Sequence, residues 1–169
     1  MRISEPLAFL RSDVDLKRGI LTVRSTKFSK SRLIPIHRST VEILRCYSQL
    51  RDQKFPRPAC SEFFISETGR VLTQNTVNWT FIKLSRQIGL RAKTDSHGPR
   101  LHDFRHTFAV KSLLNWYKTE ADVEVHIPKL STYLGHSHVN DTYWYISAVP
   151  ELLQYAMTRQ EKIEGGLLS

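Results

Sequence analysis

The sequence predicts an α+β fold that is mainly helical and carries one small antiparallel β-sheet or hairpin. Within residues 20–37, two apolar strand-like runs, "ILTVRST" and "RLIPIH", flank the polar turn "KFSK". From residue 40 onward, apolar residues recur at helical spacing in several successive stretches. Hydrophobic residues make up 40% of the 169 residues, which is enough for a real core.

The hairpin over 20–37 is expected to carry Lys27 at or beside its tip. Beyond it, Ser39 opens the tetrapeptide "STVE", in which Glu42 follows three residues later. A serine and a glutamate at this spacing are typical of a capping box, in which each side chain accepts from the backbone N–H of the other residue. We therefore predict a helix over 40–51 with Ser39 as its N-cap.

The middle of the chain is predicted to contain a short strand, a helix and a linker. "FFIS" followed by "ETGR" indicates the strand and a turn. Four apolar residues then recur at helical spacing before Gly89, which is expected to stop the helix: Val77, Phe81, Leu84 and Ile88. The polar stretch 90–99, "LRAKTDSHGP", is interpreted as a linker.

Four further helical stretches are predicted after the linker. The first runs from about Leu101 to Tyr117, and the second contains "IPKLSTYLGH", with Pro128 just inside its start and Gly135 just past its end. The segment "DTYWYISAVPELLQYAMTRQEKI" predicts two helical pieces broken near Pro150, followed by a loose "GGLLS" tail.

Basic residues outnumber acidic ones, with 25 Lys and Arg against 16 Asp and Glu, which gives a net charge of +9. A polyanion is the expected partner, because each phosphate that a cationic side chain neutralises releases condensed counterions. Nucleic acid is the first expectation and an anionic membrane the second, while a merely soluble basic domain fits the composition equally well. With no long apolar run and no leader-like N-terminus, we expect a cytoplasmic protein without a membrane partner.

Metal and cysteine chemistry are not expected. Cys46 and Cys60 lack the paired spacing of a zinc site or a disulfide framework, which favours reduced, buried thiols. His136 and His138 stand two residues apart, but no carboxylate or third histidine follows at a spacing that suits a metal. We therefore expect no metal and no cofactor.

The stretch "RLHDFRHTFAV" places several cationic side chains at the start of a predicted helix. His102 and Arg105 are three residues apart and share one helix face, while Phe104 and Phe108 are expected to point toward the core. Taken alone, such a pair is more often structural, with the histidine capping the helix and the arginine bound to an acid. Further cationic donors elsewhere in the chain weaken that interpretation.

Breaking a phosphodiester bond without a metal requires groups that this sequence contains. Guanidinium groups are the best stabilisers of the charge that grows on the phosphate oxygens, because they are planar, always charged and able to bind two oxygens. A tyrosine can be the nucleophile, although its ordinary pKa of about 10 requires nearby positive charge or a base. Lysine and histidine are suitable proton donors.

These groups occur in a particular order: "RISE" at 2–5, "TKFSKSRLIPI" at 26–36, "LHDFRH" at 101–106, "LGH" at 134–136 and "TYWYI" at 142–146. In this order the chain resembles the tyrosine recombinase (phage integrase) family over essentially all 169 residues. The resemblance implies the fold of a tyrosine recombinase catalytic domain. It also implies roles for seven residues.

By resemblance, Arg2 and Arg105 are the two phosphate-binding arginines, with Glu5 as the acid that supports Arg2. His102 accompanies Arg105. Three more positions complete the implied site: Lys27 as proton donor to the departing 5′ oxygen, His136 of "LGH", and Tyr145, nine residues beyond it, as nucleophile. The implied reaction is attack by Tyr145 on a DNA strand, which gives a 3′-phosphotyrosyl link that a second DNA end then reseals without any cofactor.

Some of these positions have rivals nearby. Lys30 also borders the hairpin turn, although Lys27 matches the family pattern better. Tyr143 would point roughly 200° away from Tyr145 on a helix, so we interpret it and Trp144 as packing residues. His106 is expected to face elsewhere and to be structural.

The resemblance also implies an organisation and partners. Residues 1–169 are expected to be a single catalytic domain without the family's N-terminal DNA core-binding domain, and 150–169 to be a C-terminal helix and tail. The expected partners are double-stranded DNA, near the nucleoid, and other protomers that assemble on DNA. Two roles stay open for the C-terminal helix, docking on a neighbouring protomer or folding back on its own domain. Without DNA we expect a monomer.

Three alternative functions remain open from the sequence. A non-catalytic DNA-binding remnant of a recombinase would keep the basic face without the chemistry. A type IB topoisomerase-like enzyme would use the same chemistry to relax DNA, although "LGHSHVNDTYWYI" favours a recombinase. A protein-interaction module without a DNA role is disfavoured by the ordered motifs.

Overall fold

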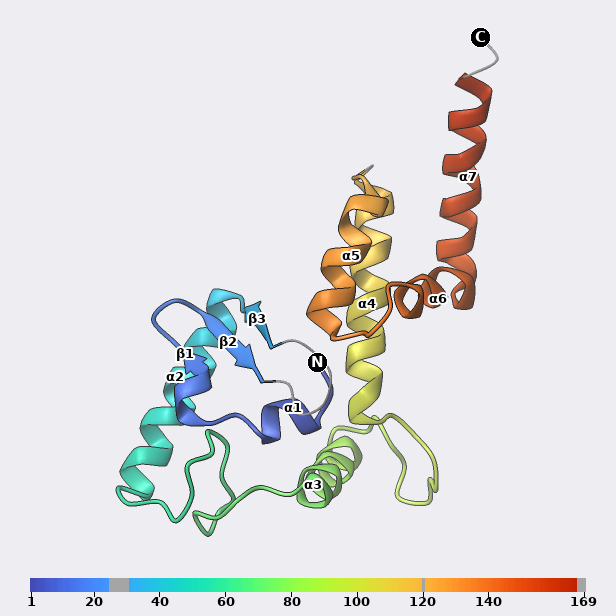
Figure 1. Cartoon of the computed structure of the whole chain (residues 1–169). Helices are drawn as coiled ribbons and strands as arrows, with labels where there is room; N and C mark the ends of the chain where they lie inside the picture. Colours follow the sequence, from blue (N-terminus) through green and yellow to red (C-terminus); the bar gives the residue numbers. More distant parts are fainter. Residues whose placement is uncertain (25–30, 120, 167–169) are drawn as a thin grey trace. The chain divides into compact units, whose positions relative to one another are not determined.

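The computed structural model describes residues 1–24, 31–119 and 121–166 of the chain. The predicted fold class is confirmed, because the described residues form a series of helices and one small antiparallel sheet (Figure 1). They divide into two compact units, Met1–Leu101 and His102–Ser169. The single catalytic domain over 1–169 stays a prediction. None of the described helices is long and apolar enough to cross a lipid bilayer.

The sheet of the first unit has the strand order β1 (Val14–Asp15), β2 (Ile20–Val23) and β3 (Arg32–Pro35), all antiparallel. Leu21 of β2 pairs with Ile34 of β3, and both side chains are buried. The predicted hairpin strands are therefore confirmed, and β1 is an addition to them. Residues 25–30, including Lys27 and Lys30, lie outside the described part of the chain.

Two short helical turns precede the sheet, α1 (Ser4–Leu7) and the 3₁₀ turn η1 (Arg11–Asp13). In place of the predicted "FFIS" strand, the structure has an isolated β-bridge between Ile65 and Val71. A second isolated bridge joins Glu62, just before this stretch, to Leu10. The turn between Ile65 and Val71 contains Gly69, whose φ of 74° is left-handed, as a turn glycine requires.

Helix α2 (Arg38–Lys54) begins earlier and ends later than the predicted 40–51. Its N-cap is His37, whose Nδ1 accepts from the Ser39 backbone N–H at 3.3 Å, so the prediction of a Ser39 cap is wrong. The helix starts almost directly after β3, which places Ser39 inside the first turn. Glu42 instead accepts from Arg38 Nε at 3.1 Å, an i,i+4 pair on the exposed surface.

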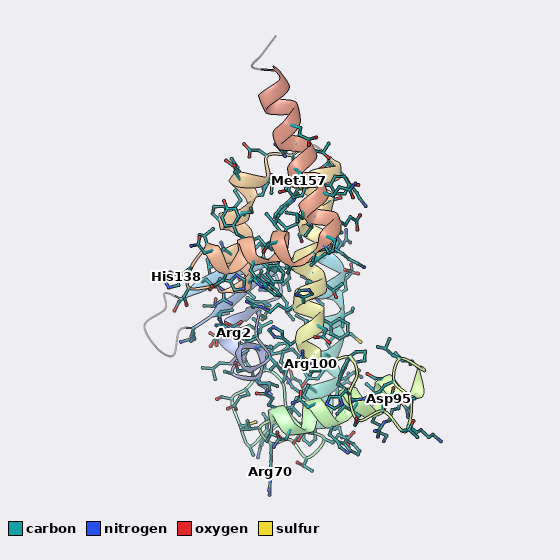
Figure 2. All side chains as sticks on the ribbon, turned by 90° about the vertical axis from the view of Figure 1, so that its right-hand side faces the viewer. Arg2, Arg70, Asp95, Arg100, His138 and Met157 are labelled. Atoms are coloured by element: carbon teal, nitrogen blue, oxygen red, sulfur yellow. The ribbon has the colours of Figure 1, made fainter. Side chains whose placement is uncertain are left out.

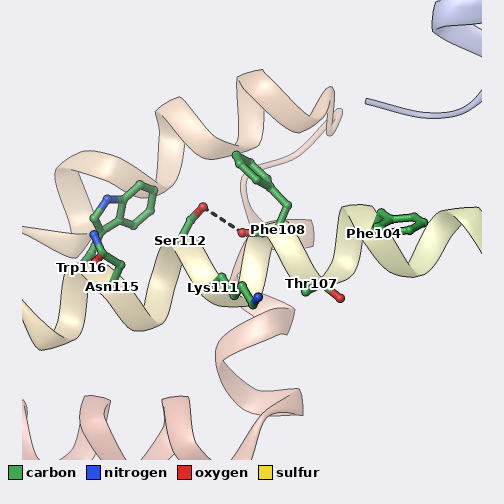
Figure 3. Close-up of a pocket in the computed structure, with 7 residues that line it drawn as sticks. All are labelled: Phe104, Thr107, Phe108, Lys111, Ser112, Asn115 and Trp116. Atoms are coloured by element: carbon green, nitrogen blue, oxygen red, sulfur yellow. Dashed lines mark hydrogen bonds between the residues drawn. The ribbon is translucent and has the colours of Figure 1, made fainter. Parts of the chain in front are cut away.

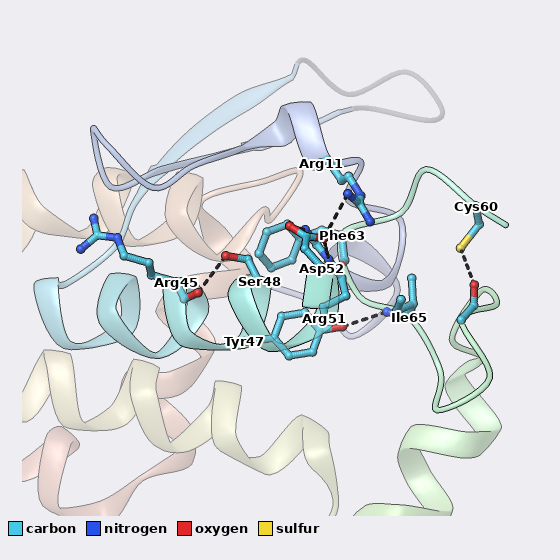
Figure 4. A network of polar contacts seen from close by, with 10 residues as sticks. Arg11, Arg45, Tyr47, Ser48, Arg51, Asp52, Cys60, Phe63 and Ile65 are labelled. Carbon is cyan, nitrogen blue, oxygen red and sulfur yellow. Dashed lines mark hydrogen bonds and ion pairs between the residues drawn. The ribbon is translucent and has the colours of Figure 1, made fainter. Parts of the chain in front are cut away.

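A buried arginine ties α2 to the segment that follows it (Figure 4). Arg51 donates from Nη1 to the Phe63 carbonyl at 2.7 Å and lies over the Phe63 ring, 4.9 Å from its centroid. A hydrogen bond from Arg51 also lowers the pKa of Asp52 below its ordinary value, with a smaller contribution from Arg11. The two cysteines are unpaired, and Cys46 is exposed, so the prediction of buried thiols is wrong for it.

Helix α3 (Gln74–Gln87) is capped by Thr73, whose Oγ1 accepts from the Thr76 backbone N–H at 3.2 Å. Gly89 has a φ of 73°, which confirms the predicted helix stop. Between α3 and the next helix the chain is irregular. Arg91 crosses this stretch and donates to the Ser96 carbonyl at 3.0 Å.

The second unit consists of four helices, α4 (Leu101–Lys118), α5 (Val123–Leu134), α6 (Asn140–Ala148) and α7 (Pro150–Gly166). Helices α4 and α5 lie side by side and antiparallel (Figure 1), since aromatic rings stack between them near both ends, Phe108 on Tyr133 and Trp116 on His126. Burial raises the pKa of Tyr133. The core of the unit is formed by eight buried residues: Ala109, Leu113, Val123, Ile127, Leu130, Leu134, Tyr145 and Leu152.

Helix α5 begins five residues before Pro128, so the predicted start is wrong. Asp122 is the N-cap and accepts from the backbone N–H groups of Glu124 and Val125 at 3.1 and 3.3 Å. Pro128 is exposed, where water can satisfy the carbonyl that the missing N–H leaves unbonded. The predicted end at Gly135 is confirmed, with a left-handed φ of 79°.

The predicted break near Pro150 is also confirmed, because Val149 between α6 and α7 is extended, as a residue before proline prefers. Helix α7 continues through Gly166, further than the predicted loose tail allowed, and 167–169 lie outside the described residues. It packs on its own unit through Leu152, which is fully buried, and Tyr155, which stacks on Tyr117.

Candidate active site

Helix α4 holds the predicted His102 and Arg105 in its first turns. Arg105 is only 7% exposed, and its Nη1 donates to the carbonyl of Leu134. That carbonyl belongs to the last turn of α5, where backbone acceptors lack helical partners and a cation is favoured by the helix dipole. Arg105 thereby holds the end of α5 against α4, whereas His102 is exposed.

The expectation that Phe104 and Phe108 point toward the core is wrong. They are 62% and 45% exposed, and Figure 3 shows them with Trp116 along an open groove of about 450 Å³ on α4. The residues that α4 buries are instead Arg105, Ala109 and Leu113, spaced four apart. Arg105 can be buried on this face because its guanidinium donates a hydrogen bond to the Leu134 carbonyl at the end of α5.

The turn after α5 positions His136. The backbone N–H groups of Gly135 and His136 both donate to the Ser131 carbonyl, at 2.9 and 3.0 Å, and Gly135 takes the left-handed conformation. The His136 ring is then held from the other side, with Nδ1 2.8 Å from Thr142 Oγ1. Thr142 belongs to α6 and is fully buried.

Tyr145 lies one helical turn beyond Thr142 and is 4% exposed. Its ring stacks on His136, with centroids 6.2 Å apart and planes 14° apart. His106 contacts the same ring from α4 at 5.1 Å, and Trp144 at 5.5 Å. The second unit therefore gathers Arg105, His136 and Tyr145 at the junction of α4, α5 and α6.

Sequence reasoning missed two residues of this cluster. The sequence predicts that His106 faces elsewhere, yet its ring contacts those of both Trp144 and Tyr145. Thr142 was not singled out at all, although its place three residues before a candidate nucleophile puts both on one helix face. Tyr143 is 44% exposed while Tyr145 is buried, in line with their predicted separation around α6.

In the first unit, Arg2 is exposed just before α1 (Figure 2), and its backbone N–H donates to Glu5 Oε2 at 2.7 Å. Both oxygens of Glu5 also accept from Arg32 Nη2 at 2.9 Å, and these two side chains are only 15% exposed. Glu5 thus links the segment that carries Arg2 to strand β3. Sequence reasoning missed Arg32.

This ion pair makes a stability prediction. Replacing Arg32 with methionine leaves the largely buried Glu5 carboxylate without its cation, and we expect the free energy of unfolding to fall by about 1–3 kcal/mol. The matched control is Arg38→Met, since the Arg38–Glu42 pair is exposed and worth about 0–0.5 kcal/mol. Urea unfolding followed by circular dichroism measures both. Equal losses in the two variants would show that the Glu5–Arg32 pair has no special role.

The fold and the cluster around Tyr145 define a class that comparison with known proteins identifies. A family model described as the phage integrase family matches residues 1–151. The chain belongs to this family. Among solved structures it is similar to the XerA recombinase, with a TM-score of 0.71 and 25% identity over 94% of this chain and 53% of that one. The Tn1549 transposon integrase, at 17% identity and a TM-score of 0.70, shows the same fold over 97% of this chain and 55% of its own.

Two curated relatives illustrate the range of similarity. The Sinorhizobium fredii (strain NBRC 101917 / NGR234) protein y4rB, whose name places it among integrases and recombinases, is 50% identical over 163 residues, 96% of this chain and 52% of its own length. Tyrosine recombinase XerA of Thermococcus onnurineus (strain NA1) is 30% identical over 169 residues, 98% of this chain and 52% of its own length. The chain spans about half the length of these relatives.

Proposed function

We propose that this chain is the catalytic domain of a site-specific DNA recombinase that cleaves and rejoins strands through a 3′-phosphotyrosyl link to Tyr145. The observation that carries the proposal is the cluster in the second unit, where a buried arginine, an oriented histidine and a tyrosine come together at the junction of α4, α5 and α6. Family membership supports the same reaction class.

The proposed reaction assigns each group a step. Tyr145 Oη attacks the scissile phosphorus, the bond from phosphorus to the 5′ oxygen breaks, and the 3′ phosphate becomes linked to the tyrosine. The phenol proton leaves to a base, and the imidazole of His106, which contacts the Tyr145 ring, is the proposed acceptor. Lys27 gives a proton to the departing 5′ oxygen, which leaves as a hydroxyl.

The arginines are proposed to bind the oxygens on which charge grows. Arg105 and Arg2 present guanidinium groups, with His102 beside Arg105 and Glu5 supporting the segment of Arg2. Strand exchange reverses the first step, since a second 5′ hydroxyl attacks the phosphotyrosyl link and releases Tyr145. Bond energy is conserved, so the proposed reaction consumes no nucleotide cofactor.

Double-stranded DNA is the proposed substrate. The solved XerH and Tn1549 integrase structures are complexes with DNA, and the net charge of +9 suits the same partner. Further protomers are the second proposed partner, and α7 offers Leu153 and Met157, which are 43% and 56% exposed. Figure 2 labels Met157 on this helix. Such a protein would act in the cytoplasm, at the nucleoid.

Covalent trapping tests the function. A library of duplexes with a randomised central segment is first enriched by salt-sensitive binding, and nicked versions of the bound sequences are then incubated with the protein. A nick near the scissile phosphate lets the 5′-hydroxyl strand diffuse away, so the adduct accumulates. We expect an SDS-stable protein–DNA band whose nucleotide maps by mass spectrometry to Tyr145.

Because the chain spans half the length of its relatives, the same assay is run on a fusion to the part of y4rB that the match leaves out. A band from the fusion alone shows that the catalytic unit needs its other half. Salt-sensitive binding to a selected site without a band from either protein contradicts the proposal and identifies a DNA-binding remnant.

A further inference from the structure

We propose that Thr142 is a positioning residue that sets the orientation and the protonated nitrogen of His136, an inference that rests on the proposed function for its catalytic consequence. The contact is short, 2.8 Å between Thr142 Oγ1 and His136 Nδ1, and the threonine is fully buried. A buried hydroxyl without a hydrogen-bond partner costs free energy, so the contact with His136 is expected to satisfy the Thr142 hydroxyl.

Other threonines of the chain show what a helical threonine ordinarily does. Thr80 and Thr132 each donate Oγ1–H to the carbonyl four residues back, at 2.8 and 3.0 Å. Thr119 and Thr158 make the same bond. Thr142 instead pairs with a side chain outside α6, the ring of His136, which lies six residues earlier in the chain. Its hydroxyl therefore serves a tertiary contact.

The chemistry of the two groups explains why the pairing matters. A hydroxyl can donate to an imidazole nitrogen or accept from it, so Thr142 fits both the neutral and the protonated ring. When Thr142 donates to Nδ1, the neutral ring must carry its proton on Nε2. That tautomer presents an N–H donor on the nitrogen opposite Thr142, the form that binds a phosphate oxygen.

The same contact links His136 to the helix of the nucleophile. The backbone of His136 is held to α5 through the Ser131 carbonyl, and the end of α5 is held to α4 by Arg105. Thr142 adds α6, on the face that also carries Tyr145 one turn later. A substitution at residue 142 should therefore change the rate of adduct formation by changing the orientation of His136.

Nitrogen NMR of the histidine rings tests the assignment without DNA. In wild type we expect the neutral His136 ring to show the Nε2–H tautomer, and Thr142→Ser to keep it. Thr142→Val, which has nearly the same shape but no hydroxyl, should shift His136 toward a mixture of tautomers and leave His126 unchanged. Identical His136 signals in wild type and Thr142→Val would overturn the inference. If Thr142→Val loses its helical circular dichroism, Thr142→Ala provides the same comparison.

Adduct formation under single-turnover conditions tests the consequence. We expect Thr142→Val to slow it by about 10–100-fold, as the loss of an orienting partner of a functional histidine does, and Thr142→Ser to remain within about threefold. In a His136→Ala background, Thr142→Val should have no further effect. An equal loss in both backgrounds would mean that Thr142 acts only on packing. Absence of adduct from both the wild-type chain and its fusion refutes the proposed function, while the NMR comparison still decides the role of Thr142.

Discussion

Replacing Tyr145 with phenylalanine is expected to abolish the covalent protein–DNA adduct, by at least about 10⁴-fold, while the protein stays folded and binds DNA. The phenol oxygen is the only atom removed. The ring contacts with His136, His106 and Trp144 can all remain, so the buried position keeps its packing. Gel analysis after denaturation in SDS measures the adduct, and electrophoretic mobility shift measures binding.

The matched control is Tyr143→Phe, which changes the same atom two residues away on the exposed side of α6. This variant should form the adduct at close to the wild-type rate. A Tyr145→Phe protein that still forms the adduct, or a Tyr143→Phe protein that has lost it, would show that the nucleophile is misassigned.

Replacing Arg105 with lysine should lower the rate of adduct formation by about 10²–10³-fold. Lysine keeps the charge but cannot present two parallel N–H donors to phosphate oxygens. The variant should also lose about 1–3 kcal/mol of stability, because the Leu134 carbonyl at the end of α5 loses its partner in a buried place. Single-turnover trapping and urea unfolding measure the two effects separately.

Arg159 offers the control for this second effect. It too donates from Nη1 to a backbone carbonyl, that of Ala121 at 2.7 Å, within the same unit. Arg159→Lys should therefore lose stability and keep the rate of adduct formation. If both variants slow adduct formation alike, the loss at Arg105 reflects a loosened fold, and Arg105 has no direct role at the phosphate.

Local patterns predicted most of the secondary structure because they depend on neighbouring residues alone. Alternation marked β2 and β3, Gly89 and Gly135 marked helix ends, and Pro150 marked the break between α6 and α7. The predicted starts of α2 and α5 were wrong because another residue caps each helix. His37 is the N-cap of α2, and Asp122 is the N-cap of α5. Each of these caps lies outside the stretch whose pattern was used.

For the candidate site, sequence patterns alone predicted the family, the order of the motifs and the candidate residues. The tertiary structure decided which of their faces are buried. Phe104 and Phe108 are on the surface while Arg105 is inside, because its guanidinium meets a carbonyl at the end of α5, 29 residues away. His106 and Thr142 were recognised as part of the site only from their contacts in the folded structure. Periodicity places side chains on a helix face, but the partner of that face is set by packing between helices distant in the chain.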